Sequence, residues 1–202
     1  MEDFLVLIDI GNTNFHIWEN GKIYNLKKIK KFDDEIYYIS VNEKKEKKLL
    51  ELNPHAKKLT PKLNTVYKGL GVDRAMACLA VEDGIVVDAG SAVTIDKMDK
   101  AKHLGGVILP GIWAMKEAYA KISPKLDCEI VNIDLNKLPK NTSEAVSYGI
   151  ISSIVSTVEN LRGDKKVYLT GGDGKFLNRF INGIYIKDLV FKGMLKSIKD
   201  KK

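Results

Sequence analysis

The feature that most constrains the fold of this 202-residue chain is a strand–turn–strand unit that occurs twice. An apolar run from Phe4 leads into Asp9 and the stretch GNTN, and a second run from Gly84 leads into Asp88 and the stretch AGS. A strand that ends in Asp-x-Gly places a carboxylate at the edge of a sheet, and the glycine permits a tight turn. Aspartates that merely form turns in two ordinary hairpins are the alternative. The repetition favours a duplicated α/β chain.

Strands and helices alternate along both halves of the chain. We expect strands at residues 4–10, 14–19, 21–26, 35–40, 84–89, 92–97, 103–109 and 165–170. We expect helices at residues 42–53, 72–83, 112–122, 141–160, 173–181 and from 190 onward. Asn20-Gly21 predicts a two-residue hairpin turn, and Asn141 with Glu144 predicts a capped helix start. The two halves therefore span 1–83 and 84–202, with a cleft between them.

Composition excludes several classes of protein. The net charge is +7, but the lysine runs at 27–31 and 44–48 lack the motifs of nucleic-acid-binding proteins, so we interpret them as solvated surface. No apolar run approaches the roughly 18 residues that span a bilayer, and the start of the chain does not resemble a signal peptide, so we expect a cytoplasmic protein. Two cysteines, Cys78 and Cys128, predict buried thiols rather than a disulfide framework or zinc site.

The two Asp-x-Gly turns have the composition of anion-binding turns. Backbone N–H groups in such a turn can form a concave anion site, and a carboxylate beside it becomes useful when a cation such as Mg²⁺ lies between carboxylate and phosphate. A third turn, Gly171-Gly172, follows an expected strand and would let backbone pass close to a flat ligand such as adenine. It does not match the Walker A pattern, because Leu169 and Phe176 occupy positions that require Gly and Ser or Thr.

Six ordered stretches resemble the motifs of type III pantothenate kinases, within the acetate kinase, sugar kinase, heat-shock 70 and actin superfamily. They are DIGNTN, GLGVDR, DAGSAVTID, GGVILPG, NTSEAVSYG and LTGGDG. The resemblance implies an α/β fold of duplicated ribonuclease-H-like (actin-like ATPase) halves. It also implies ATP-dependent phosphorylation of pantothenate to 4′-phosphopantothenate, the first step of coenzyme A synthesis, by a homodimer.

The resemblance also implies roles for individual residues. Asp73 would be the general base, Asp88 would bind a monovalent cation, K⁺ or NH₄⁺, and Asp9 would hold Mg²⁺ through water. The implied substrate-binding residues are Tyr67, Gly71, Val72, Asp73, Arg74 and Thr142. The implied ATP-binding residues are Asp9, Ile10, Gly11, Asn12, Thr13, Asn14, Phe15, His16, Ser91, Gly171 and Gly172.

Other interpretations of these residues stay open. From the sequence alone, Asp73-Arg74 also suits a helix N-cap with a surface ion pair, Thr142 suits simple capping, and Tyr67 suits a core or surface tyrosine. At the level of function, a non-catalytic regulatory protein or a kinase for another small hydroxy acid could share the fold. The presence of Asp9, Asp73 and Asp88 favours the enzyme.

Overall fold

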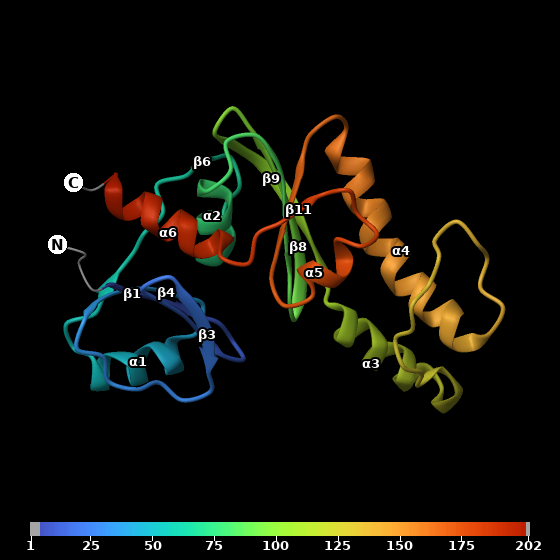
Figure 1. The fold of residues 1–202 in the computed structure, drawn as a ribbon, viewed down its shortest axis with the longest axis horizontal. Helices are drawn as coiled ribbons and strands as arrows, with labels where there is room; N and C mark the ends of the chain where they lie inside the picture. Colours follow the sequence, from blue (N-terminus) through green and yellow to red (C-terminus); the bar gives the residue numbers. More distant parts are fainter. Residues whose placement is uncertain (1–4, 201–202) are drawn as a thin grey trace. The chain divides into compact units, whose positions relative to one another are not determined.

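The computed structural model describes residues 5–200, which form two compact units (Figure 1). Unit 1 contains the described residues up to Val81 and those from Asp188 onward, and unit 2 is Glu82–Lys187. Each unit has its own sheet and its own cluster of buried apolar side chains. No helix among the described residues is long and apolar enough to cross a membrane.

The sheet of unit 1 has the strand order β3-β2-β1-β4-β5. Its strands are β1 (Leu5–Ile10), β2 (Phe15–Glu19), β3 (Lys22–Leu26), β4 (Glu35–Ser40) and β5 (Lys57–Lys58). The first three strands are antiparallel neighbours, whereas β4 runs parallel to β1 and β5 parallel to β4. Asn20 and Gly21, at φ 48 and 85, form the predicted turn between β2 and β3. A short strand, β6 (Asn64–Thr65), follows later in the chain.

Three helices complete unit 1. They are α1 (Glu43–Leu52), α2 (Val72–Leu79) and α6 (Leu189–Lys199). Asn42 caps α1, and Leu49 brings the apolar face of that helix onto the buried cluster of β1, β2 and β4 side chains. The helix pair α2 and α6 packs closely at Gly193, where a Cβ would overlap the carbonyl oxygen of Met76. The close approach of these two helices therefore requires a glycine in α6.

The sheet of unit 2 repeats the arrangement of unit 1. Its strands are β7 (Gly84–Ala89), β8 (Ala92–Asp99), β9 (Lys102–Pro110), β10 (Val167–Thr170) and β11 (Ile184–Tyr185). They follow the order β11-β10-β7-β8-β9, with β7, β8 and β9 antiparallel and β10 and β11 parallel to β7. Read from β9, this order matches that of unit 1 strand for strand, so the predicted duplicated α/β fold is confirmed.

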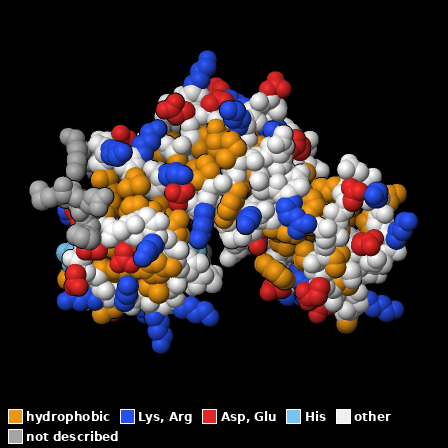
Figure 2. Space-filling model, viewed as in Figure 1, with side chains coloured by type: hydrophobic (Ala, Val, Ile, Leu, Met, Phe, Trp, Pro, Cys, Tyr) orange, Lys and Arg blue, Asp and Glu red, His pale blue; other side chains and the backbone are white. Residues whose placement is uncertain are grey.

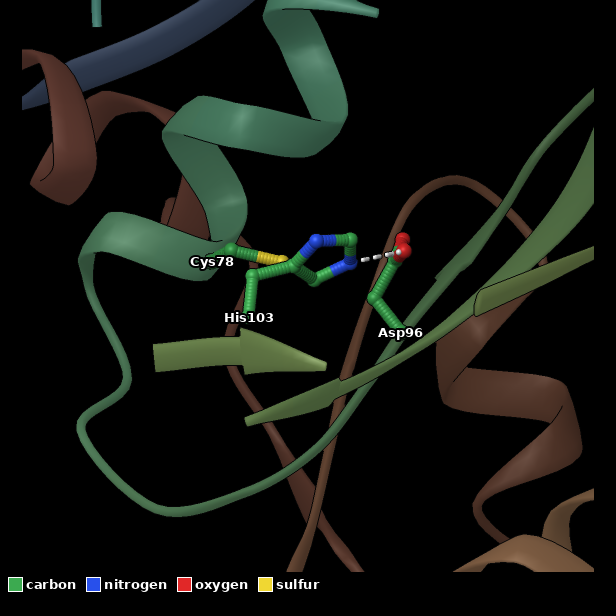
Figure 3. A group of neighbouring side chains, drawn as sticks. All are labelled: Cys78, Asp96 and His103. Atoms are coloured by element: carbon green, nitrogen blue, oxygen red, sulfur yellow. Dashed lines mark hydrogen bonds and ion pairs between the residues drawn. The ribbon is translucent and has the colours of Figure 1, made fainter. Parts of the chain in front are cut away.

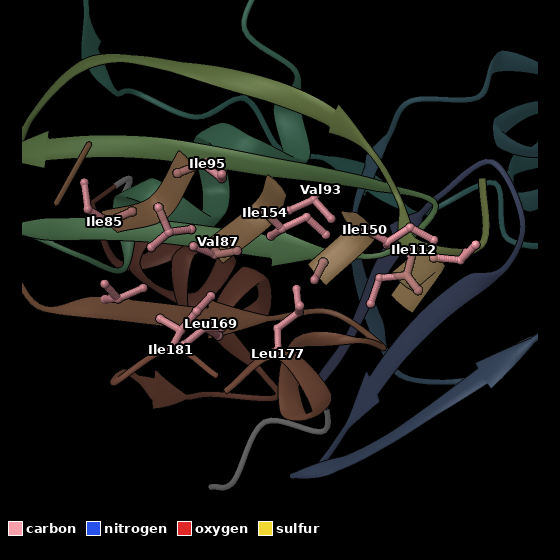
Figure 4. Packing of buried hydrophobic residues seen from close by; sticks show 14 residues of the cluster. Ile85, Val87, Val93, Ile95, Ile112, Ile150, Ile154, Leu169, Leu177 and Ile181 are labelled. Carbon is pink, nitrogen blue, oxygen red and sulfur yellow. The ribbon is translucent and has the colours of Figure 1, made fainter. Parts of the chain in front are cut away.

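The helices of unit 2 cover a buried apolar cluster. They are α3 (Ile112–Ile122), the 3₁₀ turn η1 (Pro124–Leu126), α4 (Thr142–Arg162) and α5 (Gly174–Leu177). Figure 4 shows Ile150 and Ile154 of α4 among strand side chains such as Val87 and Ile95. Asn141 caps α4 by accepting a hydrogen bond from the Glu144 N–H at 3.0 Å, which confirms the predicted helix start. The buried cluster includes Ala89 and Leu169, which lie at or next to the ends of β7 and β10.

The compact units differ from the predicted halves at the C-terminus. The whole segment after residue 83 was expected in the second half, whereas Asp188 and the residues after it belong with unit 1. The physical reason is the packing of α6 on α2, a contact between segments far apart in the chain. The helix expected at 72–83 also ends earlier, at Leu79.

The charged surface largely follows the sequence prediction. The face drawn in Figure 2 shows Lys and Arg side chains dispersed among acidic and uncharged groups. In α1, Lys44, Lys47 and Lys48 are exposed, as expected for a solvated lysine run. Lys45 is the exception in this helix, because it is half-buried.

Candidate active site

The turn between β1 and β2 is a four-residue loop at the carboxyl end of β1. Ile10 pairs with Phe15 across the ladder, and the Gly11 N–H donates to the Asn14 carbonyl oxygen at 3.1 Å. Asn12 and Thr13 are exposed at the tip. Because the Gly11 N–H is used to close the loop, an anion at this turn would contact the exposed residues Asn12 and Thr13. We call residues 11–14, for which phosphate binding is a prediction, the first phosphate loop.

Asp9 and His16 lie opposite one another at the base of this loop. They pair across the β1–β2 ladder, and both are half-buried. The imidazole Nδ1 of His16 lies 2.8 Å from the side-chain oxygen Oδ1 of Asn25. This contact holds the His16 ring against Asn25 of the neighbouring strand β3.

The start of α1 is held against the first phosphate loop. Ile10 pairs with Ser40 in the parallel ladder, so β1 and β4 end at the same edge of the sheet. The Asn42 side-chain amide donates to Asn12 Oδ1 at 3.4 Å. Ligands of open α/β sheets bind at such carboxyl ends, which supports the predicted location of the phosphate site.

Lys45 is a residue of this region that sequence reasoning missed. Its Nζ donates to the Gly11 carbonyl oxygen at 3.1 Å and lies 5.3 Å from the centre of the Phe15 ring. Burial, with repulsion from Lys48, lowers the pKa of Lys45. The run EKKEKK shows that one helix face is charged, but it carries no signal that singles out the lysine folded onto the loop.

The predicted base turn lies at the start of α2. Gly71 caps the helix, and Asp73 Oδ1 accepts a hydrogen bond from the backbone N–H of Arg74 at 2.8 Å. The Arg74 guanidinium carbon lies 5.0 Å from the centre of the Tyr67 ring, a cation–π geometry, and Arg74 is only 6% exposed. The alternatives of an Asp73 N-cap and a surface arginine are therefore wrong, because Gly71 is the cap and Arg74 is buried.

In unit 2, two turns meet at the carboxyl ends of β7 and β10. Asp88 pairs with Thr170 in the parallel ladder, so the chain leaves both strands at one edge. The Asp173 N–H donates to the Ala89 carbonyl oxygen at 3.0 Å. A Cβ at Gly171, whose φ is +83, would lie 2.5 Å from Asp88 Oδ1 and would overlap the Ala89 oxygen. The turn Gly171-Gly172, which is predicted to contact adenine, thus packs directly against residues 88–91. We call these two segments the adenosine turn and the second phosphate loop.

The Pro110-Gly111 segment packs against the same loop. The Gly111 N–H donates to the Ser91 carbonyl oxygen at 3.1 Å, and a Cβ at Gly111 would lie 2.7 Å from that oxygen. Gly111 therefore permits a close approach of the two backbone segments. Gly105, at φ +135, instead lies beside the irregular β8–β9 register at Lys97/Met98.

A pocket of about 380 Å³ opens beside the second phosphate loop. Its lining residues are Gly90, Ser91, Trp113, Ala114, Glu117 and Asp173. Trp113 is 56% exposed, and burial raises the pKa of Asp173. The pocket joins the predicted ATP-contacting Ser91 to two residues, Trp113 and Asp173, that sequence reasoning did not select. The available sequence signal was the tryptophan that closely follows Pro110-Gly111.

Thr142 lies at the exposed first position of α4, and it does not line this pocket. Its predicted contact with pantothenate stays a prediction. The helix cap itself comes from Asn141, so capping by the Thr142 side chain is not needed to explain the helix start.

His103 is buried in the sheet of unit 2. His103 Nε2 lies 2.8 Å from Asp96 Oδ1, and both side chains are at most 1% exposed (Figure 3). Cys78 is buried as predicted, whereas Cys128 is only half-buried, with its sulfur 3.6 Å from the Lys125 carbonyl oxygen. The expectation of two buried thiols is thus correct for Cys78 and wrong for Cys128.

Comparison of the sequence with known proteins identifies the family to which the chain is similar. The sequence pattern of type III pantothenate kinases matches residues 41–163. The type III pantothenate kinase of Wolinella succinogenes is 47% identical over 206 residues, covering 98% of either chain. That of Helicobacter hepaticus is 46% identical over 200 residues, covering 95% of this chain and 97% of the relative.

Solved structures agree with the fold. A Campylobacter jejuni protein described as a conserved putative Baf family transcriptional activator superposes with a TM-score of 0.84 at 40% identity, covering 97% of this chain and 98% of that one. A putative 2-dehydro-3-deoxygalactonokinase from Sinorhizobium meliloti superposes with a TM-score of 0.61 at 9% identity, covering 98% and 99% of the two chains, which shows a shared fold alone. With its family pattern, its full-length relatives and its duplicated sheets, the chain belongs to the type III pantothenate kinase family.

Proposed function

We propose that this protein transfers the γ-phosphoryl group of ATP to the primary hydroxyl of pantothenate, giving 4′-phosphopantothenate in coenzyme A synthesis. The observation that carries the proposal is the 47% identity to a type III pantothenate kinase over 98% of either chain. The glycine-dependent loops at the strand ends agree with it. Phosphoryl transfer depends mainly on positioning and on neutralising charge, and both tasks suit residues held on rigid strand ends.

We assign the role of general base to Asp73. Its carboxylate is held at the first turn of α2 by the Arg74 N–H, and a carboxylate in this place can accept the proton of the attacking hydroxyl. In this proposal the carboxylate group of pantothenate binds Arg74, whose guanidinium is oriented by the Tyr67 ring. Gly71 and Val72 shape the turn, and Thr142 contacts the same substrate.

The two phosphate loops and the adenosine turn would bind ATP. Residues 9–16, which include the first phosphate loop, would contact the phosphates in unit 1. Ser91, Gly171 and Gly172 would contact ATP in unit 2. The contact between the Asp173 N–H and the Ala89 oxygen supports the pairing of these two turns in one nucleotide site.

Two cations would complete the site. The half-buried Asp9 offers carboxylate oxygens at the end of β1, the donor type that suits Mg²⁺, and we propose that it holds Mg²⁺ through water. Asp88 offers the same donor type at the end of β7, where its Oδ1 packs close against Gly171, and we propose that it binds K⁺ or NH₄⁺. Bound cations would neutralise phosphate charge during transfer.

The active form that we propose is a cytoplasmic homodimer. ATP as phosphoryl donor and the buried thiol of Cys78 support the location. Light scattering of the purified protein measures the oligomeric state directly, and a monomer at the concentration used for activity assays would contradict the dimer.

Two other functions compete with this proposal. A regulatory protein on the same fold is suggested by the name of the Campylobacter jejuni relative. A kinase for another small hydroxy acid is allowed by the fold. The test is to incubate the protein with labelled ATP and either pantothenate, galactose or acetate. Label on pantothenate alone supports the proposal. Label on galactose or acetate instead would mean that the substrate is another small molecule, and label on none of the three favours the regulatory function.

A further inference from the structure

Lys45 occupies a position that a solvated surface lysine would not adopt. Its Nζ donates to the Gly11 carbonyl oxygen and lies over the Phe15 ring, which is itself only 2% exposed. Gly11 and Phe15 stand at the two ends of the first phosphate loop. Lys45 of α1 therefore contacts residues at both ends of the loop. The other lysines of this helix, Lys44, Lys47 and Lys48, are exposed.

The charge of Lys45 is poorly compensated. In the part of the chain that the structure describes, no carboxylate forms an ion pair with its ammonium group, which bonds to a neutral carbonyl instead. An ammonium group has three N–H donors, and the Gly11 oxygen takes one. Burial and the neighbouring Lys48 both disfavour the charge. An anion at the loop would supply an acceptor for the other N–H groups and a countercharge for the ammonium group.

Local architecture holds the lysine in this place. Its own backbone N–H donates to the Asn42 cap at 3.1 Å, and the Asn42 amide donates to Asn12 in the loop. The Asn42 side chain thus links the start of α1, where Lys45 lies, to the first phosphate loop. A preorganised cation costs little conformational entropy when a ligand binds.

We propose that Lys45 is a phosphate-binding residue, whose ammonium group contacts the triphosphate of the nucleotide bound by the first phosphate loop. The inference rests on the assignment of that loop to ATP in the proposed function. The competing explanation is a purely structural brace, in which the hydrogen bond to Gly11 only stabilises the loop.

Equilibrium binding separates these explanations without requiring turnover. Titration calorimetry with a non-hydrolysable ATP analogue and with adenosine would be run on wild type, Lys45→Gln, Lys45→Arg and the control Lys44→Gln. A lost charge-assisted contact weakens analogue binding by about 10-fold or more. We expect this loss in Lys45→Gln, with adenosine binding unchanged, recovery in Lys45→Arg, and no change in Lys44→Gln.

Several results would overturn the inference. One is wild-type analogue affinity in Lys45→Gln. Another is an equal loss for the analogue and adenosine, or an equal loss in Lys45→Gln and Lys45→Arg, since each indicates a damaged loop. A wild-type protein that binds no analogue contradicts the ATP assignment and this inference with it. A wild-type protein that binds the analogue but does not phosphorylate pantothenate contradicts the proposed substrate alone and leaves the Lys45 comparison valid.

Discussion

The carboxylate of Asp73 folds back over Gly71, so that a Cβ at Gly71 would lie 2.6 Å from Asp73 Oδ1. The absence of a side chain at residue 71 therefore sets the position of the proposed base. The backbone of Gly71, at φ −58 and ψ 143, is open to other residues, so the demand for glycine comes from the carboxylate and not from backbone strain.

Gly71→Ala is expected to preserve folding and to displace the Asp73 carboxylate. A small misplacement of a reacting group can lower turnover by about 10- to 100-fold. Steady-state kinetics and a thermal unfolding curve check this expectation together. Unchanged kcat in a folded variant would mean that the observed carboxylate position is not the reactive one.

Asp73→Asn is expected to fold and to lose turnover by about 100-fold or more, the usual cost of removing an acid–base group. The amide keeps an acceptor oxygen for the Arg74 N–H, so the turn should survive. Single-turnover measurement of phosphopantothenate formation checks the chemical step. A variant within a few fold of wild type would exclude Asp73 as the base.

Gly171→Ala is expected to destabilise the protein, while Gly172→Ala next to it is expected to be tolerated. Gly171 has φ +83 and its Cβ would overlap the Ala89 oxygen, whereas a Cβ at Gly172 meets nothing within 4 Å. A positive φ costs a non-glycine residue about 1–2 kcal/mol before the overlap is counted. Denaturant unfolding of both variants tests this, and equal midpoints would show that the turn relaxes.

Asp173→Asn is expected to stabilise the folded protein at neutral pH. Burial raises the pKa of Asp173, so its ionised form costs free energy on folding, and this cost disappears once both folded and unfolded states are protonated. The stability gain should therefore be present at about pH 7 and shrink as the pH falls through the raised pKa toward about pH 4. Denaturant unfolding of wild type and variant across this pH range measures the gain. A gain that is independent of pH would contradict burial of the carboxylate as its cause.

The local elements were largely predictable from the sequence. Apolar runs ending in Asp-x-Gly predict β1 and β7 with their hairpins, and Asn20-Gly21 predicts the turn after β2, because these features depend on neighbouring residues alone. The very short strands β5, β6 and β11 have no such pattern. Strands β5 and β11 form because the longer strands β4 and β10 offer them backbone hydrogen bonds.

Features that depend on contacts between distant segments were not predictable. The return of α6 to unit 1 rests on Gly193 meeting the Met76 carbonyl, and the position of Lys45 rests on α1 lying beside the β1–β2 loop. Periodicity gives the apolar face of each helix but not its partner. The candidate site shows the same division, since its loops follow from motifs while Trp113 and Asp173 enter through packing.

The measurement that tests the proposed kinase activity most directly is ADP release from ATP and Mg²⁺ in the presence and absence of pantothenate, with K⁺ or Na⁺ as the monovalent cation. We expect release that requires pantothenate and is much faster in K⁺ than in Na⁺. Release that requires pantothenate but is equal in both salts would contradict the cation role of Asp88. No pantothenate-dependent release from folded, dimeric protein would contradict the kinase itself.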